Sequence, residues 1–122
     1  MLTNVFLVAL GGATGSVLRY LAFLALVRWL GVQSPWPTAA INVLGCFVAG
    51  LVLGRLAGSP PDHALRSLLI VGVLGGFTTF SAFAGETVLL VQRGEVLGAM
   101  LGVGVSVALC LGGAAAGHWL AA

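Results

Sequence analysis

The sequence predicts an all-α integral membrane protein with four transmembrane helices. Of its 122 residues, 60% are hydrophobic and only 7% are charged. A soluble domain carries about a quarter of its residues as charged side chains, so this composition excludes a soluble domain, a disordered chain and a coiled coil. Five scattered arginines and no lysine also exclude a nucleic-acid-binding surface.

Four apolar stretches are long enough to cross a bilayer core, which needs about 20 residues of helix. They cover residues 3–27, 37–53, 67–90 and 96–120. The connections between them, 28–36, 55–66 and 92–95, are short. We therefore expect a single four-helix transmembrane domain over residues 1–122.

The ends of these stretches fit membrane interfaces. Trp29, Trp36 and Trp119 lie at span ends, where an amphipathic ring suits the headgroup region. The first stretch has no basic leader, so we expect a transmembrane helix there and not a secretory signal. His63 and His118 are expected at the surface, because neither lies in a metal-ligand pattern.

The arginine distribution gives no preferred orientation. Arg55 and Arg66 would lie on the side of both termini, and Arg28 and Arg93 on the opposite side. Because the positive-inside rule then favours neither orientation, we expect insertion both ways and an antiparallel dual-topology homodimer.

Glycines also recur at the spacing that lets helices approach closely. The sets are Gly50, Gly54 and Gly58; Gly98 and Gly102; and Gly113 and Gly117. They either join two subunits or pack helices within one.

The third stretch contains a sequence that is unfavourable for a continuous helix. Two adjacent glycines, Gly75 and Gly76, precede Phe77 and the β-branched pair Thr78 and Thr79. A helix broken in mid-membrane frees carbonyls that coordinate a small cation such as Na⁺. The alternative is a continuous helix in which the glycines pack against a neighbour.

Arg19 and Asn42 are polar residues inside predicted spans, where a functional role is the default interpretation. Arg19 either attracts an anion or is a structural residue bound to helix-end carbonyls. The Asn42 amide either offers two donors to a partly dehydrated anion or makes an interhelical hydrogen bond.

Two further pairs have either an anion-binding or a packing role. Phe80 and Phe83 share a helix face and present positively polarised ring edges, although such a pair usually packs. Ser106 and Cys110, four residues apart, form a weak donor track or pack. Cys46 and Cys110 are expected to be reduced and packed, since two cysteines show no disulfide or metal-ligand spacing.

Three motifs occur in a distinctive order along the chain. They are Gly11-Gly12 with Gly15 and Arg19-Tyr20, then Asn42 with Gly45-Cys46-Phe47, then Gly75-Gly76-Phe77-Thr78-Thr79-Phe80-Ser81 through Glu86. Together they cover three of the four predicted helices, and their combination resembles the small bacterial fluoride channels of the Fluc or CrcB family.

The resemblance implies an ion channel, and not an enzyme, in the bacterial cytoplasmic (inner) membrane. It implies passive fluoride export that lowers intracellular fluoride toxicity, through two antiparallel pores of a dual-topology homodimer. It further implies a structural, non-transported Na⁺ at the dimer centre, held by the backbone carbonyls of Gly75 and Thr78. The expected partners are fluoride, a second copy of the chain and membrane lipid, with no nucleic acid.

The resemblance also implies a fluoride pathway and its electrostatic surroundings. The pathway residues are Asn42, Thr79, Phe80, Ser81, Phe83, Ser106 and Cys110. Arg19 would supply positive potential near the vestibule or centre, and Glu86 either matches a family acid or is an ordinary interfacial carboxylate. Ala82 and Ala84 replace hydroxyl residues that are frequent in the family, so the hydroxyl path is expected to be shorter.

Three other functions have less support. A small multidrug-type exporter needs a carboxylate in its first span, where this chain has Arg19. A non-transporting membrane assembly subunit explains the glycines but not Arg19, Asn42 and the threonine pair. An intramembrane hydrolase needs a base near Ser81, and both histidines lie at span margins.

Overall fold

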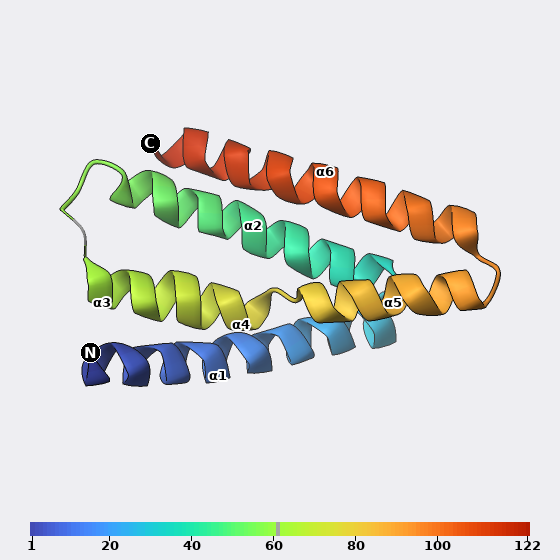
Figure 1. Ribbon diagram of the computed structural model, residues 1–122, viewed down its shortest axis with the longest axis horizontal. Helices are drawn as coiled ribbons and strands as arrows, with labels where there is room; N and C mark the ends of the chain where they lie inside the picture. Colours follow the sequence, from blue (N-terminus) through green and yellow to red (C-terminus); the bar gives the residue numbers. More distant parts are fainter. Residues whose placement is uncertain (61) are drawn as a thin grey trace.

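The computed structural model describes residues 1–60 and 62–122, and the described chain is helical apart from short connections (Figure 1). Four helices are long and apolar enough to cross a membrane, which confirms the predicted fold class. The elements are α1 (Leu2–Leu24), η1 (Ala25–Trp29), α2 (Trp36–Leu56), α3 (His63–Arg66), η2 (Ser67–Leu74), α4 (Gly75–Phe77), α5 (Phe80–Gln92) and α6 (Val96–Ala121). Both termini lie at the end of the molecule that also carries the α2–α3 connection (Figure 1).

The helices extend further than the sequence pattern indicates. Arg28, expected in a connection, lies within η1. The third of the four long helices, which comprises α3, η2, α4 and α5, already begins at His63. That early start has a local cause, because the Asp62 carboxylate accepts a hydrogen bond from the Leu65 N–H at 3.0 Å and caps α3. Pro61, in the same connection, lies outside the described residues.

The turn between α5 and α6 is closed by a glycine. Gly94 has a φ of 81°, a left-handed conformation in which a side chain is strained. The Glu95 N–H donates to the Leu90 carbonyl at 2.8 Å, and the Gly94 N–H donates to the Val91 carbonyl at 3.0 Å. This pair of bonds is a Schellman motif, and it ends α5 while directing the chain into α6.

Helices α2 and α6 pack side by side through glycines. A Cβ on Gly50 would meet the Ala114 carbonyl, a Cβ on Gly54 would lie 2.5 Å from the His118 carbonyl, and a Cβ on Gly117 would meet the Phe47 carbonyl. These glycines therefore pack two helices of one subunit, the second of the two roles considered above. A Cβ on Gly98, by contrast, would have nothing within 4 Å.

Helix α1 packs against the first half of the third helix in the same way. A Cβ on Gly11 would lie 2.5 Å from the Leu68 carbonyl, and one on Gly15 would meet the Val73 carbonyl. A Cβ on Gly76 would lie 2.5 Å from the Gly12 carbonyl, so Gly76 is a packing glycine. Gly75 is different, because the nearest neighbour of a Cβ there, the Ile70 carbonyl, would be 3.6 Å away.

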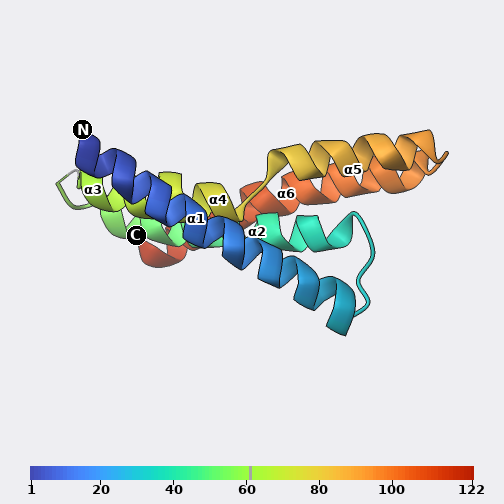
Figure 2. The ribbon, with the colours of Figure 1, turned by 90° about the horizontal axis from the view of Figure 1, so that it is seen from below.

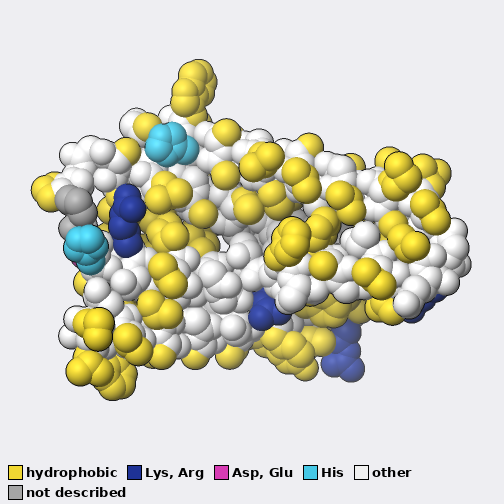
Figure 3. Space-filling model, in the orientation of Figure 1, with side chains coloured by type: hydrophobic (Ala, Val, Ile, Leu, Met, Phe, Trp, Pro, Cys, Tyr) yellow, Lys and Arg dark blue, Asp and Glu magenta, His cyan; other side chains and the backbone are white. Residues whose placement is uncertain are grey.

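Much of the outer surface is apolar. Hydrophobic side chains are spread along the length of the face in Figure 3, whereas charged ones are sparse. Both histidines are exposed, as expected, and so is Trp119, with 87% of its surface accessible. The C-terminal half of α1 diverges from α5 and α6 (Figure 2). An apolar surface of this extent is typical of a protein embedded in lipid or covered by another subunit.

Candidate functional site

The third helix is interrupted at Thr78 and Thr79. Their backbones are extended, with φ and ψ of −84° and 154° at Thr78 and −147° and 116° at Thr79. Each threonine hydroxyl stabilises one side of the interruption. The Thr78 Oγ1 donates to the Leu74 carbonyl at 2.8 Å, and the Thr79 Oγ1 accepts from the Ala82 N–H at 3.2 Å. Thr79 is therefore the N-cap of α5.

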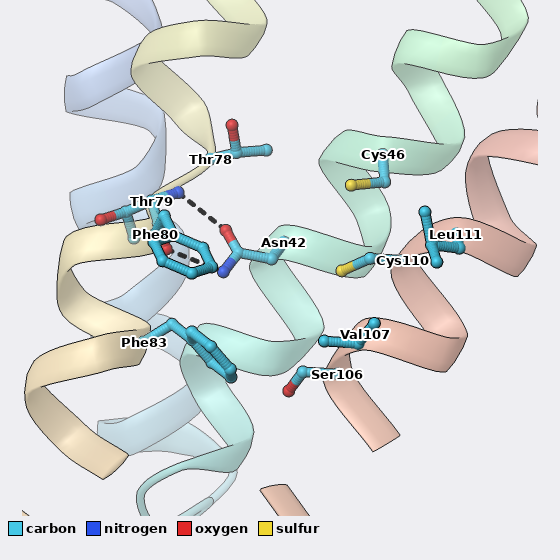
Figure 4. Close-up of a pocket in the computed structure, with 10 residues that line it drawn as sticks. All are labelled: Asn42, Cys46, Thr78, Thr79, Phe80, Phe83, Ser106, Val107, Cys110 and Leu111. Atoms are coloured by element: carbon cyan, nitrogen blue, oxygen red, sulfur yellow. Dashed lines mark hydrogen bonds between the residues drawn. The ribbon is translucent and has the colours of Figure 1, made fainter. Parts of the chain in front are cut away.

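Asn42 of α2 binds the interrupted backbone from the side. Its Nδ2 donates to the Thr79 carbonyl at 2.9 Å, and its Oδ1 accepts from the Thr79 N–H at 2.7 Å (Figure 4). The amide therefore binds both backbone groups of Thr79 and replaces the helical acceptor that the interruption takes from its N–H. Asn42 therefore makes the interhelical hydrogen bond that the sequence analysis considered for it. One of its two Nδ2 hydrogens is not used by these bonds and remains available as a donor.

The interruption removes the helical donors of two carbonyls. In a continuous helix the Thr79 N–H would donate to Gly75 and the Ala82 N–H to Thr78. These two N–H groups donate instead to Asn42 Oδ1 and Thr79 Oγ1. The Gly75 and Thr78 carbonyls therefore lose their helical donors.

The Gly76 carbonyl is bound by a side chain from α1. Arg19 donates its Nε–H to this carbonyl at 3.0 Å. The contact is the structural role considered for Arg19, in which the guanidinium satisfies a helix-end carbonyl. The Arg19 side chain is partly buried, and its positive charge lies close to the interruption.

A cavity of about 320 Å³ lies between α2, α5 and α6, next to the interruption. It is bounded by side chains from all three helices and from the Thr78–Thr79 segment (Figure 4). The lining residues are Asn42, Cys46, Thr78, Thr79, Phe80, Phe83, Ser106, Val107, Cys110 and Leu111. Six of the seven expected pathway residues meet in this one cavity, whereas Ser81 is outside the lining.

The cavity wall carries two phenylalanine rings and a buried serine hydroxyl. The Phe80 and Phe83 ring centroids are 5.3 Å apart with an interplanar angle of 45°. Ser106 is only 4% exposed, and its Oγ has no hydrogen-bond partner within the described residues. A buried hydroxyl without a partner costs free energy unless a ligand or water supplies one. Ser81 Oγ instead lies 3.2 Å from the Thr79 Oγ1.

The fold brings Cys46 and Cys110 together. Both thiols are free, and they are neighbours on facing helices, with both sulfur atoms directed towards the cavity (Figure 4). The free thiols agree with the expectation that both cysteines are reduced, but the sequence analysis did not foresee this pairing. Asn42 and Cys46 on α2, and Ser106 and Cys110 on α6, each share a helix face at a spacing of four. These two spacings were the feature of the sequence that could have indicated a shared cavity for the two cysteines.

The Glu86 side chain of α5 points towards α2. Its Oε1 accepts a hydrogen bond from the Thr38 hydroxyl at 2.7 Å, and Thr38 is only 3% exposed. The other carboxylate oxygen, Oε2, is buried without a partner in the described part of the chain. The sequence analysis did not identify Thr38 as the partner of Glu86, because nothing in the sequence except its place in the first turn of α2 distinguishes this threonine. Arg19, Gly75 and Glu86 are not part of the cavity lining.

Comparison with known proteins identifies relatives along nearly the whole chain. The family described as "CrcB-like protein, Camphor Resistance (CrcB)" matches residues 6–118. A protein of Shewanella sp. (strain W3-18-1), named fluoride-specific ion channel FluC, is 44% identical over 90% of this chain and 89% of its own length. A protein of the same name from Allorhizobium ampelinum is 45% identical over 96% of this chain and 98% of its own length.

Proposed function

The chain belongs to the CrcB (Fluc) family, and we propose that it is a fluoride-specific ion channel whose pathway runs through the cavity between α2, α5 and α6. The relatives named above carry that activity in their names and align over most of their length. The observation that carries the location of the pathway is the meeting of Asn42, Phe80, Phe83, Ser106 and Cys110 around one cavity.

The cavity offers an anion weak donors in place of a full positive charge. The remaining Nδ2 hydrogen of Asn42 and the unpartnered Ser106 hydroxyl are neutral donors, and the two phenylalanine rings present positive edges. Such partners compensate partial dehydration of a small anion without holding it too tightly to leave. The passage we propose is passive, through a cavity whose lining consists of neutral side chains and backbone.

The working unit we propose is an antiparallel dual-topology homodimer with two pores. Phe80 is 77% exposed in the single chain, although it contributes to the cavity wall. Helix α1 also diverges from α5 (Figure 2), and apolar side chains such as Leu21 on α1 and Val88 on α5 are exposed in one subunit. A second copy inserted in the opposite orientation would cover these side chains, and the equal arginine counts at the two ends permit that orientation.

A structural Na⁺ fits the interruption at the centre of this dimer. The Gly75 and Thr78 carbonyls have lost their helical donors, and unwound backbone carbonyls are typical Na⁺ ligands in membrane proteins. Two carbonyls from one chain are too few for a closed shell of oxygen ligands, so two copies would share the ion. When bound, the ion would supply positive charge that compensates the freed carbonyls and fixes the two interruptions together. It would not be transported.

The proposed location is the bacterial cytoplasmic (inner) membrane, where fluoride export lowers the intracellular concentration of a toxic anion. The four apolar helices make the chain a multi-pass membrane protein. No structural observation favours the exporter or the assembly subunit over the channel.

Fluoride efflux from proteoliposomes tests the proposed function. Purified protein is reconstituted into vesicles loaded with both fluoride and chloride, with Na⁺ present throughout, and both anions are followed with ion-selective electrodes. Fast fluoride release with chloride retained is the expected result. Absence of fluoride release from folded, dimeric protein would overturn the proposal and favour the non-transporting subunit.

A further inference from the structure

We propose that Cys46 and Cys110 form a two-thiolate site for a thiophilic divalent metal cation, represented by mercuric ion, and that binding there closes the cavity. The two cysteines lie on facing helices, α2 and α6, and both sulfur atoms point into the same cavity (Figure 4). Neither thiol is engaged in a disulfide. They are the softest ligands in the cavity lining, which otherwise offers apolar, amide and hydroxyl groups.

A second observation at the same place indicates room for a ligand. The Ser106 hydroxyl is buried, lines the cavity and has no partner in the described residues. Ser106 lies one helical turn before Cys110, so its oxygen faces the same space as the Cys110 sulfur. A cation bound to the two thiolates would have this oxygen as a weak additional donor.

The number of ligands selects the kind of metal. Among the described residues, no group of three or more histidine, cysteine or acidic side chains is positioned to bind a metal ion. Tetrahedral zinc, which takes four such ligands or three with water, is therefore disfavoured. Mercuric ion accepts two thiolates in a linear arrangement and needs no further strong ligand.

Charge balance favours a divalent cation. Binding forms two S–Hg bonds and breaks two S–H bonds, so one ion displaces two protons to solvent and no electron is transferred. The resulting bis-thiolate complex is neutral. A neutral complex avoids the desolvation penalty that a lone thiolate or a lone cation would incur inside a membrane.

Retention of mercury against a competing monothiol tests the site itself. The full-length protein is treated with mercuric ion, washed with excess glutathione, and analysed for mercury per chain. Because the second bond forms within one molecule, wild type should retain about one ion per chain, at least about a hundredfold more tightly than a single thiol. Cys46→Ser and Cys110→Ser should each lose the ion in the wash. Equal loss of mercury from wild type and the variants, or retention of mercury by either single variant, would overturn the proposal.

The closing of the cavity rests on the proposed function and is measured separately. Fluoride efflux is recorded for each protein before and after mercury and the wash, so that each variant is compared with its own untreated rate. The fluoride efflux rate of wild type should fall at least about tenfold after mercury and the wash, whereas the rate of each single variant should return to its own untreated value. Absence of fluoride efflux from untreated wild type would refute the channel and leave the binding result standing. Cys46→Ala and Cys110→Ala replace any serine variant that fails to elute as folded protein.

Discussion

Asn42 and Thr79 form a two-bond pair in which one amide satisfies both the N–H and the carbonyl of an interrupted helix, at 2.7 Å and 2.9 Å. Asn42→Asp keeps the acceptor for the Thr79 N–H, loses the donor for the carbonyl and adds a negative charge beside the cavity. We expect fluoride efflux to fall at least about tenfold, because a like charge in a low-dielectric site repels the anion.

The control for this charge is Gln92→Glu, the same amide-to-acid change at the exposed end of α5. It should leave efflux within about twofold of wild type, because solvent screens an exposed charge outside the cavity. An unchanged rate for Asn42→Asp would remove Asn42 from the pathway.

Gly45 allows α2 to approach the interruption. A Cβ at this position would collide with the Thr78 Cγ2 and lie 3.2 Å from a Phe77 ring carbon. We expect Gly45→Ala to destabilise the protein by about 1–3 kcal/mol, since the collision forces Thr78 out of place. The loss is measured as a lower midpoint in thermal unfolding in detergent. Gly98→Ala, where a Cβ meets nothing within 4 Å, is the matched control and should not lower the midpoint.

Arg19 holds the Gly76 carbonyl through its Nε–H. Arg19→Met keeps much of the side-chain length but removes the donor, so the partly buried carbonyl loses this partner. The expected cost is about 1–3 kcal/mol in unfolding free energy. Arg93→Met, in the exposed α5–α6 turn, serves as the control. Equal midpoints for the two variants would show that the Arg19 contact contributes no stability.

Phe80 is largely exposed in the single chain, so its ring contributes little to the packing of one subunit. Phe80→Ile keeps bulk but removes the positive ring edge, and we expect fluoride efflux to fall about tenfold with little change in chain folding. Phe6→Ile, at an α1 residue that is 72% exposed, is the matched control. Unaltered conduction in the Phe80 variant would mean that this ring only packs.

Thr38 supplies the hydroxyl that binds Glu86 Oε1. Thr38→Val preserves the shape of the side chain and leaves both carboxylate oxygens without a partner from the described residues. We expect a destabilisation of about 1–3 kcal/mol, measured by thermal unfolding. Thr87→Val is the control, because within the described residues the Thr87 hydroxyl bonds to the Phe83 carbonyl of its own helix and to no group on another helix. A cost no larger than that of the control would show that the buried carboxylate has another partner.

The sequence was sufficient to predict the four helices, because a charge-free stretch of membrane length has few other stable conformations. It was less accurate at the ends. The connection expected over 55–66 is shortened by the Asp62 cap of α3, which depends on a single side-chain hydrogen bond. The roles of glycines such as Gly50 and Gly117 also needed the structure, since spacing alone does not identify the helix that a small residue contacts.

The sequence by itself determined the membrane fold, the family and the set of polar residues that a bilayer tolerates only for a reason. Only the tertiary structure decided which of those residues meet. Asn42 reaches Thr79, Arg19 reaches Gly76, Thr38 reaches Glu86, and Cys46 faces the same cavity as Cys110. Each contact joins positions far apart in the chain. Periodicity describes one helix at a time, whereas these pairings depend on how the helices are rotated and packed against each other.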